Sequence, residues 1–260
     1  MSLERQTRSG LAFYRNPRWG SLKHGIFTRS GGVSAPPFSS LNLGGNVGDT
    51  PQSVRHNHER MYASLDVDDR RACTVWQVHG NDVVIAQGPV RGRRWLALAD
   101  GLVTDSLDVP LSMRFADCVP LLFFDPVQGV IGMAHAGWRG TVAGVGSKVV
   151  ETMRIAYDCR PGDIEAVIGP SIGPDHYQVG EEVVEAVQAY FGLLDGLIRR
   201  DAADGSAYLD LWAANALDLQ RAGLEQIEIA GICTATHTDE FFSHRAEHGR
   251  TGRFGAVMCL

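Results

Sequence analysis

Residues 116–140 read ADCVPLLFFDPVQGVIGMAHAGWRG, and they contain two strongly apolar runs, 120–125 and 129–135, with a short turn between them. Valine, isoleucine and phenylalanine favour β-strands, and the aspartate, proline and glycine between the runs are typical of turns. Pro120 cannot donate a hydrogen bond inside a sheet, so it marks the entrance of the first strand and leaves Cys118 on the rim. The stretch therefore predicts two buried strands with polar residues at their ends.

The rest of the chain alternates strand-like and helix-like segments. Further strands are expected at 24–28, 72–79, 82–86, 110–116, 227–235 and 254–260. Helices are expected at 51–65, 138–157, 181–191 and within 209–224. Segment 29–49 is too rich in glycine, proline and serine to be regular, and we expect a long loop there. This pattern predicts a mixed α/β chain with its sheet in the first half and residues 1–260 in one domain.

Composition disfavours several classes of function. The chain has 260 residues, of which 44% are hydrophobic, and this is enough to bury a large core. Its net charge of −6 provides no basic surface field, so we expect no binding to nucleic acid. The first residues lack the apolar region of a signal peptide, and the longest apolar run is too short to cross a membrane. These features predict a soluble, cytoplasmic protein.

Three residues with metal-binding side chains lie at the ends of expected strands. They are His79 in WQVHG, Cys118 in ADCVP and His135 in AHAGW, and a glycine or proline follows each within two residues. Such a residue lets the backbone turn, so that the side chain projects from the end of the sheet. Two imidazoles and one thiolate leave a fourth position open, which is typical of catalytic zinc, and copper accepts the same ligands. Zinc there would lower the pKa of a bound water or polarise a substrate atom.

Two other interpretations of these residues stay open. The separations of 39 and 17 residues differ from the short spacing of strong zinc motifs, so two hydrogen-bonded histidines beside a packed thiol are an alternative. Cys118 could also act as a nucleophile with His135 as its base, without a metal. The five cysteines are an odd number in a chain without secretory features, so we expect no disulfide framework.

Several arginines near glycines are candidate binders of anions. They are Arg29, Arg139, Arg245, Arg250 and Arg253. A guanidinium group matches the oxygens of phosphate or carboxylate in a bidentate way. Arg139 is expected at the start of a helix, where it would face the same pocket as His135. For each of these arginines the alternative is a solvated surface position.

A series of short motifs runs in order from about residue 24 to the end of the chain. The motifs are TRSGGVS (28–34), SLNLGGNVGD (40–49), WQVHG (76–80), ADGLVT (99–104), ADCVPLLFFDP (116–126), AHAGWRGT (134–141), IGPSIGP (168–174), YQVGEEV (177–183), FFSHR (241–245) and GRTGR (249–253). Together they resemble the bacterial laccase-domain proteins, once named polyphenol oxidases and now regarded as purine nucleoside phosphorylases and adenosine deaminases. The resemblance implies a layered α-β-β-α sandwich with mixed sheets, related to a toxin-like hydrolase fold with a Cys/His pair.

The resemblance also implies a zinc ion held by His79, Cys118 and His135 beside a pocket for purine nucleosides and phosphate. Catalytic roles then fall to Cys118, His135 and Asp117. Substrate binding falls to Arg29, Asn42, Gln77, Arg139, Arg245 and Arg253. Members of the family cleave adenosine, inosine, guanosine and methylthioadenosine with phosphate, and they deaminate adenosine.

From this resemblance we expect a zinc-dependent purine nucleoside phosphorylase with adenosine deaminase activity. The alternative is a cysteine hydrolase or amidase that edits peptidoglycan precursors, with Cys118 and His135 as its catalytic pair. A four-copper polyphenol oxidase needs more histidine ligands than nine scattered histidines supply, so we favour zinc over copper.

The chain departs from the family pattern at four positions. Asp175 and His176 stand where many members have two cysteines, Gln178 stands in place of an acidic residue, and Ala246 stands in place of an arginine. None of these positions is an expected metal ligand, so the differences bear on substrate preference.

Overall fold

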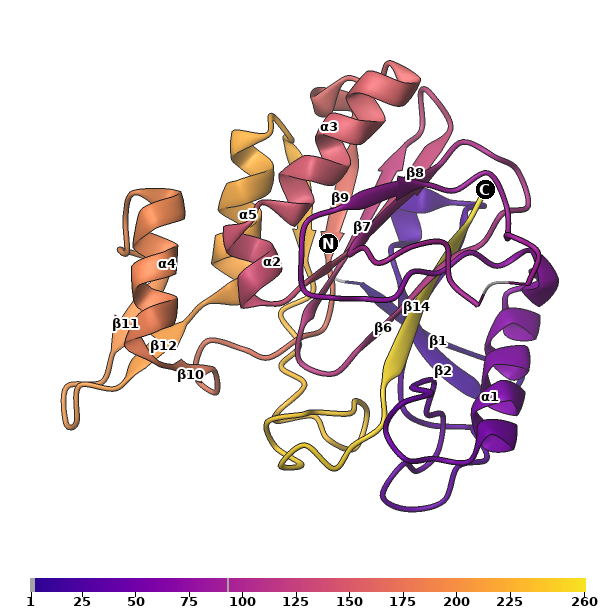
Figure 1. Ribbon diagram of the computed structural model, residues 1–260, viewed down its shortest axis with the longest axis horizontal. Coiled ribbons are helices and arrows are strands. Elements are labelled where there is room, and N and C mark those ends of the chain that lie inside the picture. Colours follow the sequence, from indigo (N-terminus) through magenta and orange to yellow (C-terminus); the bar gives the residue numbers. More distant parts are fainter. Residues whose placement is uncertain (1–2, 93) are drawn as a thin grey trace.

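The computed structural model describes residues 3–92 and 94–260, and its central feature is a pair of β-sheets with helices on both outer faces (Figure 1). The six-stranded sheet has the order β13 (Gln226–Ile229), β9 (Glu165–Ile168), β7 (Val119–Asp125), β8 (Val130–Ala136), β5 (Gly101–Thr104) and β4 (Val83–Ile85). The five-stranded sheet has the order β1 (Glu4–Arg8), β2 (Leu11–Arg15), β3 (Lys23–Phe27), β14 (Phe254–Cys259) and β6 (Leu111–Phe115). The second sheet is antiparallel, whereas the first is mixed, with parallel pairs at both of its edges.

A small third sheet and five α-helices complete the part of the chain that the structure describes. The small sheet has the order β10 (Gln178–Val179), β12 (Ala207–Leu209) and β11 (Ile198–Arg200). The helices are α1 (Pro51–Ser64), α2 (Trp138–Val142), α3 (Val145–Tyr157), α4 (Glu181–Phe191) and α5 (Leu211–Arg221). No helix among residues 3–92 and 94–260 is long and apolar enough to span a bilayer.

Three clusters of buried apolar side chains define the layers. One lies between the two sheets and joins residues of β6 and β14 to residues of β5, β7 and β8. Another joins the opposite face of the six-stranded sheet to α3, α4 and α5, and the third joins the five-stranded sheet to α1. The order of helices, sheet, sheet and helix confirms the predicted α-β-β-α arrangement.

Strand β7 explains why the opening stretch reads as a continuous apolar run. Leu121 and Phe123 belong to the cluster under the helices, whereas Leu122 and Phe124 pack into the cluster between the sheets. Successive side chains of a strand point to opposite faces, and both faces of β7 are covered, so all its residues before the final Asp125 are apolar. The expected strands at 120–125 and 129–135 are confirmed as β7 and β8.

Several expectations about the other elements are wrong. Residues 72–79 form no strand, because Cys73 and Trp76 make isolated bridges to two different segments, at Leu111 and Leu98. The helix expected at 138–157 is two helices, because Gly144 between them adopts a left-handed φ of +73°.

The prediction of a sheet confined to the first half of the chain is also wrong. Strand β14 lies between β3 and β6 in the five-stranded sheet, and β9 and β13 extend the six-stranded one. The last of these is shorter than the expected strand at 227–235, since it ends at Ile229. Each of the two large sheets therefore contains strands from both halves of the sequence, and the small third sheet lies entirely in the second half.

Candidate metal centre

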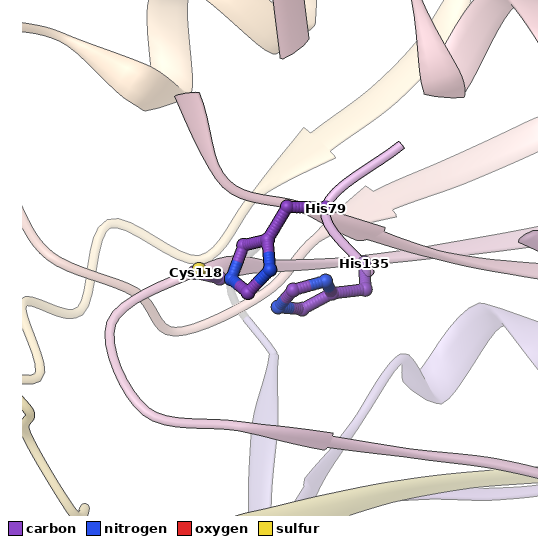
Figure 2. A group of neighbouring side chains, drawn as sticks. All are labelled: His79, Cys118 and His135. Atoms are coloured by element: carbon purple, nitrogen blue, oxygen red, sulfur yellow. The ribbon is translucent and has the colours of Figure 1, made fainter. Parts of the chain in front are cut away.

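His79, Cys118 and His135 meet at the edge of the six-stranded sheet. Cys118 directly precedes β7, His135 lies in β8, and the pairing of Pro120 with His135 brings these two strand ends together. His79 arrives from the loop before β4 (Figure 2). One ligand atom from each residue lies within 4.8 Å of those of the other two, and the two imidazole rings are 4.9 Å apart between centroids. The predicted convergence of the three side chains is confirmed.

Asp100, at the start of β5, holds both histidines in place. Its Oδ1 lies 2.8 Å from Nδ1 of His135, and its Oδ2 accepts the backbone N–H groups of Val78 and Gly80 at 3.0 and 2.7 Å. The first contact keeps a proton of His135 on Nδ1, so Nε2 is the nitrogen that faces His79 and Cys118 and would bind a metal. The other two contacts fix the loop on both sides of His79. One fully buried carboxylate thus positions two of the three candidate ligands.

Two backbone features bring the chain close to this group. His79 has a φ of +62°, a left-handed conformation that is uncommon for a residue with a side chain. A Cβ atom at Gly137 would lie 2.8 Å from Sγ of Cys118 and 3.4 Å from the ring of His79. Only glycine therefore fits where the chain leaves β8 and enters α2.

Electrostatics in the group favour a thiolate beside charged or metal-bound imidazole. Burial raises the pKa of the Cys118 thiol, but His135 and His79 outweigh that effect, so its pKa lies below the ordinary value. Burial lowers the pKa of His135, but Cys118 and Asp100 outweigh it, so that pKa lies above the ordinary value. A thiolate is the form of cysteine that binds metals and attacks electrophiles.

The donor set fits a single metal ion. Zinc binds histidine nitrogen at about 2.0–2.1 Å and cysteine sulfur at about 2.3 Å, so its ligand atoms must lie a few ångströms apart, as they do here. The contact of His135 with Asp100 is the arrangement by which carboxylates orient metal-binding imidazoles. Three protein ligands leave a coordination position for water or substrate, and this group could therefore hold a catalytic metal.

A cavity of about 930 Å³ opens beside this group. Its wall includes Asp117, Gln77, Trp138, Arg139, Tyr177, His244, Arg245 and Arg253 around the three candidate ligands, and Trp76, Trp95, His58, Arg94 and Arg114 elsewhere. The volume is at the upper end for small-molecule sites, which range from about 300 to 1,000 Å³. The cavity has room for a nucleoside together with a second small substrate.

Three of the predicted arginines face this cavity. The guanidinium of Arg139 lies over the ring of Trp138, 4.4 Å from its centroid, and that of Arg245 lies 5.3 Å from the centroid of Tyr177. Arg253 donates to the carbonyl oxygen of Gly252 at 2.8 Å. These arginines bring positive charge to the same wall as the candidate metal ligands.

Asp117 and Gln77 also line the cavity, but their polar atoms already have protein partners. Asp117 accepts the hydroxyl of Thr234 at 2.7 Å and the backbone N–H of Arg245 at 2.6 Å. Gln77 accepts the N–H of Arg114 at 3.1 Å and donates to its carbonyl oxygen at 2.8 Å. Both side chains thereby fix neighbouring arginines of the wall.

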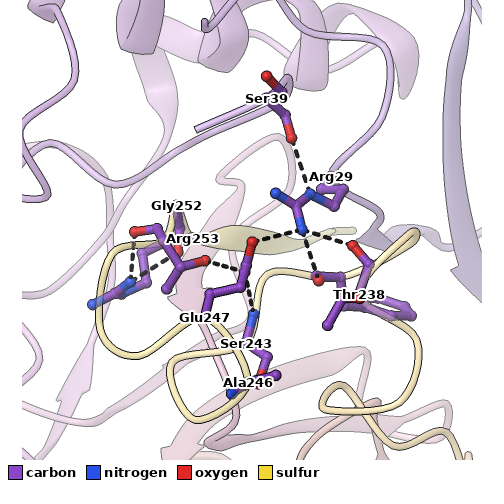
Figure 3. A network of polar contacts seen from close by, with 10 residues as sticks. Arg29, Ser39, Thr238, Ser243, Ala246, Glu247, Gly252 and Arg253 are labelled. Atoms are coloured by element: carbon purple, nitrogen blue, oxygen red, sulfur yellow. Dashed lines mark hydrogen bonds and ion pairs between the residues drawn. The ribbon is translucent and has the colours of Figure 1, made fainter. Parts of the chain in front are cut away.

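The structure does not bring Arg29 to the cavity. Its Nη1 donates to the carbonyl oxygen of Thr238 at 2.6 Å and to the carboxylate of Glu247 at 3.0 Å, while Nε donates to the carbonyl oxygen of Ser39 at 2.9 Å (Figure 3). Glu247 in turn accepts the backbone N–H of Ser243 at 3.0 Å. Arg29 therefore joins the loop after β3 to the C-terminal loop, which carries His244 and Arg245.

Asn42 is fully buried and, like Arg29, lies outside the cavity wall. Its Oδ1 accepts the backbone N–H groups of Gly44 and Arg253 at 2.9 Å, and its Nδ2 donates to Asp49 at 2.8 Å. Asn42 orders the loop beside Arg253 without reaching the cavity wall. Arg250, also considered as an anion binder, is exposed and lies outside that wall as well.

Sequence reasoning missed several residues of the site. Asp100 lies in the motif ADGLVT, but nothing in the spacing of that motif indicates a partner 35 residues away. Arg114, Tyr177 and His244 line the cavity from three separate segments. The sequence signal for Arg114 is a charged residue within a mostly apolar expected strand, 110–116.

Comparisons with known proteins assign the chain to a family. Residues 23–260 match the family described as multi-copper polyphenol oxidoreductase laccase. The chain belongs to this family. The described residues contain one group of three histidine, cysteine or acidic side chains that could hold a metal, and it is the group formed by His79, Cys118 and His135.

Relatives in the family are named as nucleoside-cleaving enzymes. The chain is 41% identical over 254 residues to a purine nucleoside phosphorylase of Deinococcus radiodurans, which covers 98% of this chain and 95% of the relative. It is 39% identical over 237 residues to purine nucleoside phosphorylase YlmD of Bacillus subtilis, with coverages of 88% and 85%. The crystal structure of YlmD from Geobacillus stearothermophilus superimposes with a TM-score of 0.91 at 36% identity over 98% of both chains.

Proposed function

We propose that this chain is a zinc-dependent purine nucleoside phosphorylase that also deaminates adenosine. The observation that supports this most directly is the approach of His79, Cys118 and His135 to within 4.8 Å of one another in the wall of a large cavity that arginines also line. The names of the relatives supply the substrate class. Zinc suits two nitrogens, one sulfur and an open position, and copper is the alternative ion for the same donors.

Phosphorolysis requires that a nucleoside and phosphate lie together in the cavity. An oxygen of phosphate forms a bond to the anomeric carbon, the bond from that carbon to the purine nitrogen breaks, and the purine leaves with the electron pair and a proton. Arg139, Arg245 and Arg253 would neutralise the phosphate and hold it in line, because guanidinium groups pair with its oxygens.

The chain's own residues would prepare the metal for this chemistry. His79, Cys118 and His135 would hold zinc, which acts as a Lewis acid and lowers the pKa of coordinated water. Asp100 would keep Nε2 of His135 available, and Asp117 is the residue that we propose for proton transfer to purine substrates. For deamination, water adds to C6 of adenosine and ammonia leaves.

Product analysis on protein purified without an affinity tag tests this proposal. Adenosine with phosphate should yield adenine and ribose 1-phosphate, adenosine alone should yield inosine, and metal analysis should give about one zinc per chain. Parallel reactions with inosine, guanosine and methylthioadenosine rank the substrates. If no product forms at any loading of zinc or copper, the proposal is wrong.

A cysteine hydrolase or amidase is the second candidate, and one arrangement favours it. Cys118, His135 and Asp100 lie in the order of a nucleophile, a base and a carboxylate that orients the base. This function predicts rapid alkylation of Cys118 by iodoacetamide and full amidase activity toward peptidoglycan precursors in a chelator. Loss of activity in the chelator and its return with zinc would instead support the first proposal.

A further inference from the structure

A second group of cationic side chains lines the same cavity on the side of α1. Strand β6 places Leu111, Met113 and Phe115 in the cluster between the sheets. Side chains alternate along a strand, so Arg114 points away from that cluster and into the cavity wall beside Tyr62 and His58. None of the proposed catalytic steps uses this part of the cavity.

Arg114 is held rigidly but carries no opposite charge. Its Nη1 donates to the hydroxyl of Thr74 at 3.1 Å and its Nη2 to the carbonyl oxygen of Val75 at 2.9 Å. Gln77 fixes its backbone from both sides. Among residues 3–92 and 94–260 no carboxylate lies within 4.0 Å of its guanidinium nitrogens. Burial lowers the pKa of Arg114, and a half-buried cation without a counter-charge is costly.

A second guanidinium acts on the same region. Arg94 lines the cavity, and a Cβ atom at Gly45 would lie 3.9 Å from its Nη2. The pKa of His58 is lowered to about 4, first by burial, then by Arg114 and also by Arg94. Nε2 of His58 lies 3.0 Å from the carbonyl oxygen of Leu43, which can only accept, so the ring is neutral with its proton on Nε2. Both arginines therefore place positive potential at one neutral histidine.

Two acidic side chains of the wall on this side do not neutralise Arg94 or Arg114. Glu59 and Asp69 line the cavity, but both are exposed, and Glu59 faces His56 at 3.6 Å. In the part of the chain that the structure describes, neither forms an ion pair with Arg94 or Arg114. The two guanidinium groups therefore have no protein counter-ion among the described residues, and an anion from solution would supply one.

We propose that Arg114 and Arg94 form a second oxyanion subsite of the cavity, which binds a phosphate group. Two guanidinium groups match the charge of a phosphate dianion better than that of a single carboxylate, and each Nη atom of Arg114 has a second N–H beyond the one that it donates to Thr74 or Val75. The hydroxyl of Thr74 adds a polar group beside Arg114.

The phosphate has two possible sources. One is inorganic phosphate, which would bind here in addition to the phosphate substrate that the proposed phosphorolysis holds at Arg139, Arg245 and Arg253. The other is the phosphate ester of a nucleotide. Trp76 and Trp95, whose rings lie 4.8 Å apart between centroids in the same wall, offer an aromatic surface for its base.

Calorimetric titration of the full chain tests the subsite. The ligands are inorganic phosphate, adenosine 5′-phosphate and, as the uncharged comparison, adenosine. The variants are Arg94→Gln, Arg114→Lys and Arg114→Gln, and Arg154→Gln is the matched control, since Arg154 is an exposed arginine of α3 outside this cavity. Arg94 is exposed, so its variant remains informative if either change at Arg114 impairs folding.

We expect Arg94→Gln and Arg114→Gln each to weaken phosphate binding by about 10- to 100-fold, as for loss of a charged hydrogen bond, with adenosine binding unchanged. A loss for inorganic phosphate identifies the free ion as the occupant, and a loss for adenosine 5′-phosphate alone identifies a nucleotide. If Arg94→Gln binds both ligands like the wild type, or if the wild type binds neither, the subsite does not exist. Binding of phosphate that depends on Arg94, without any phosphorolysis, contradicts the proposed function and not the subsite.

Discussion

Two polar clusters of this molecule are built from distant segments, but they differ in how their hydrogen-bonding groups are used. Around Arg29 and Glu247, guanidinium and carboxylate are paired with each other and with backbone groups of both loops (Figure 3). Around His135, one ring nitrogen contacts Asp100, and the other faces His79 and Cys118 (Figure 2). In the first cluster the polar groups are bonded to other groups of the protein, so they contribute to stability. In the second, nitrogen and sulfur atoms face one another, so they can bind a metal ion.

Replacing a candidate ligand should have the largest effect on function. We expect Cys118→Ala to lower metal affinity by more than about 100-fold, beyond the range for residues that only orient ligands, and to abolish turnover. Metal analysis and product formation measure these effects. Cys233→Ala, which changes another half-buried cysteine outside the cavity, should keep both. Full metal content in Cys118→Ala would contradict the assignment of the thiolate as a ligand.

Asp100→Asn should produce the next largest effect. An amide offers one acceptor oxygen where the carboxylate serves His135, Val78 and Gly80 with two. We expect a decrease in metal affinity of about 10- to 100-fold, measured by competition with a chromogenic chelator. The control is Asp82→Asn, at an exposed acidic residue of the same loop region. Equal affinities in the two variants would show that Asp100 does not orient the site.

The cluster around Arg29 should respond in stability rather than in chemistry. We expect Arg29→Gln to lower the free energy of unfolding by about 2 kcal/mol, because hydrogen bonds to charged groups are lost in a half-buried site. The turnover rate per folded molecule of Arg29→Gln should equal that of the wild type. Urea titration and assays well below the unfolding transition separate the two. Arg200→Gln breaks an exposed pair with Glu181 and should cost less, since water screens it. Unchanged stability with lost turnover would place Arg29 among the functional residues.

His24 offers the smallest test, as an imidazole whose two nitrogens both have backbone partners, Leu22 and Asn16. Burial is the main reason that its pKa is lowered from 6.5 to about 4. The unfolded chain therefore binds the extra proton below pH 6.5, and stability is lost as pH falls towards 4. Between pH 8 and pH 5.5 this histidine should contribute a loss of about 1.4 kcal/mol.

The pH dependence of unfolding in His24→Gln measures this contribution. The variant should lack that part of the slope, whereas His56→Gln, at an exposed histidine, should retain it. An identical slope in wild type and His24→Gln would show that His24 is not held neutral.

The sequence predicted well those elements whose pattern depends on local packing. The runs at 120–125 and 129–135 became β7 and β8, and Thr50 caps α1 by accepting the N–H of Ser53 at 3.3 Å, as expected for a helix that begins at Pro51. The strand expected at 72–79 failed because Cys73 and Trp76 form bridges to two different segments, and the N–H group of Val78 donates to Asp100 instead of to a neighbouring strand.

The residues of the site also separate into those that the sequence predicted and those that it did not. Histidines and a cysteine at strand ends are visible in the sequence, and their convergence follows from the pairing of β7 with β8. Arg29 and Asn42 carry the same donor groups as residues of the cavity, but their partners come from loops far away in the chain, which spacing does not reveal. The assignment of residues 1–260 to one domain and the choice of nucleoside stay predictions.

By itself the sequence determined the α/β class, the two buried strands and the identity of the three candidate ligands, because runs of apolar residues and the placement of turns are local properties. Only the tertiary structure decided which polar groups are paired internally. Asp100 reaches both histidines, Glu247 pairs with Arg29, and Arg114 keeps an unpaired charge in the cavity wall. These contacts depend on how the sheets stack and how distant loops meet, and the hydrogen bonds that result separate the residues of the scaffold from those that can bind a ligand.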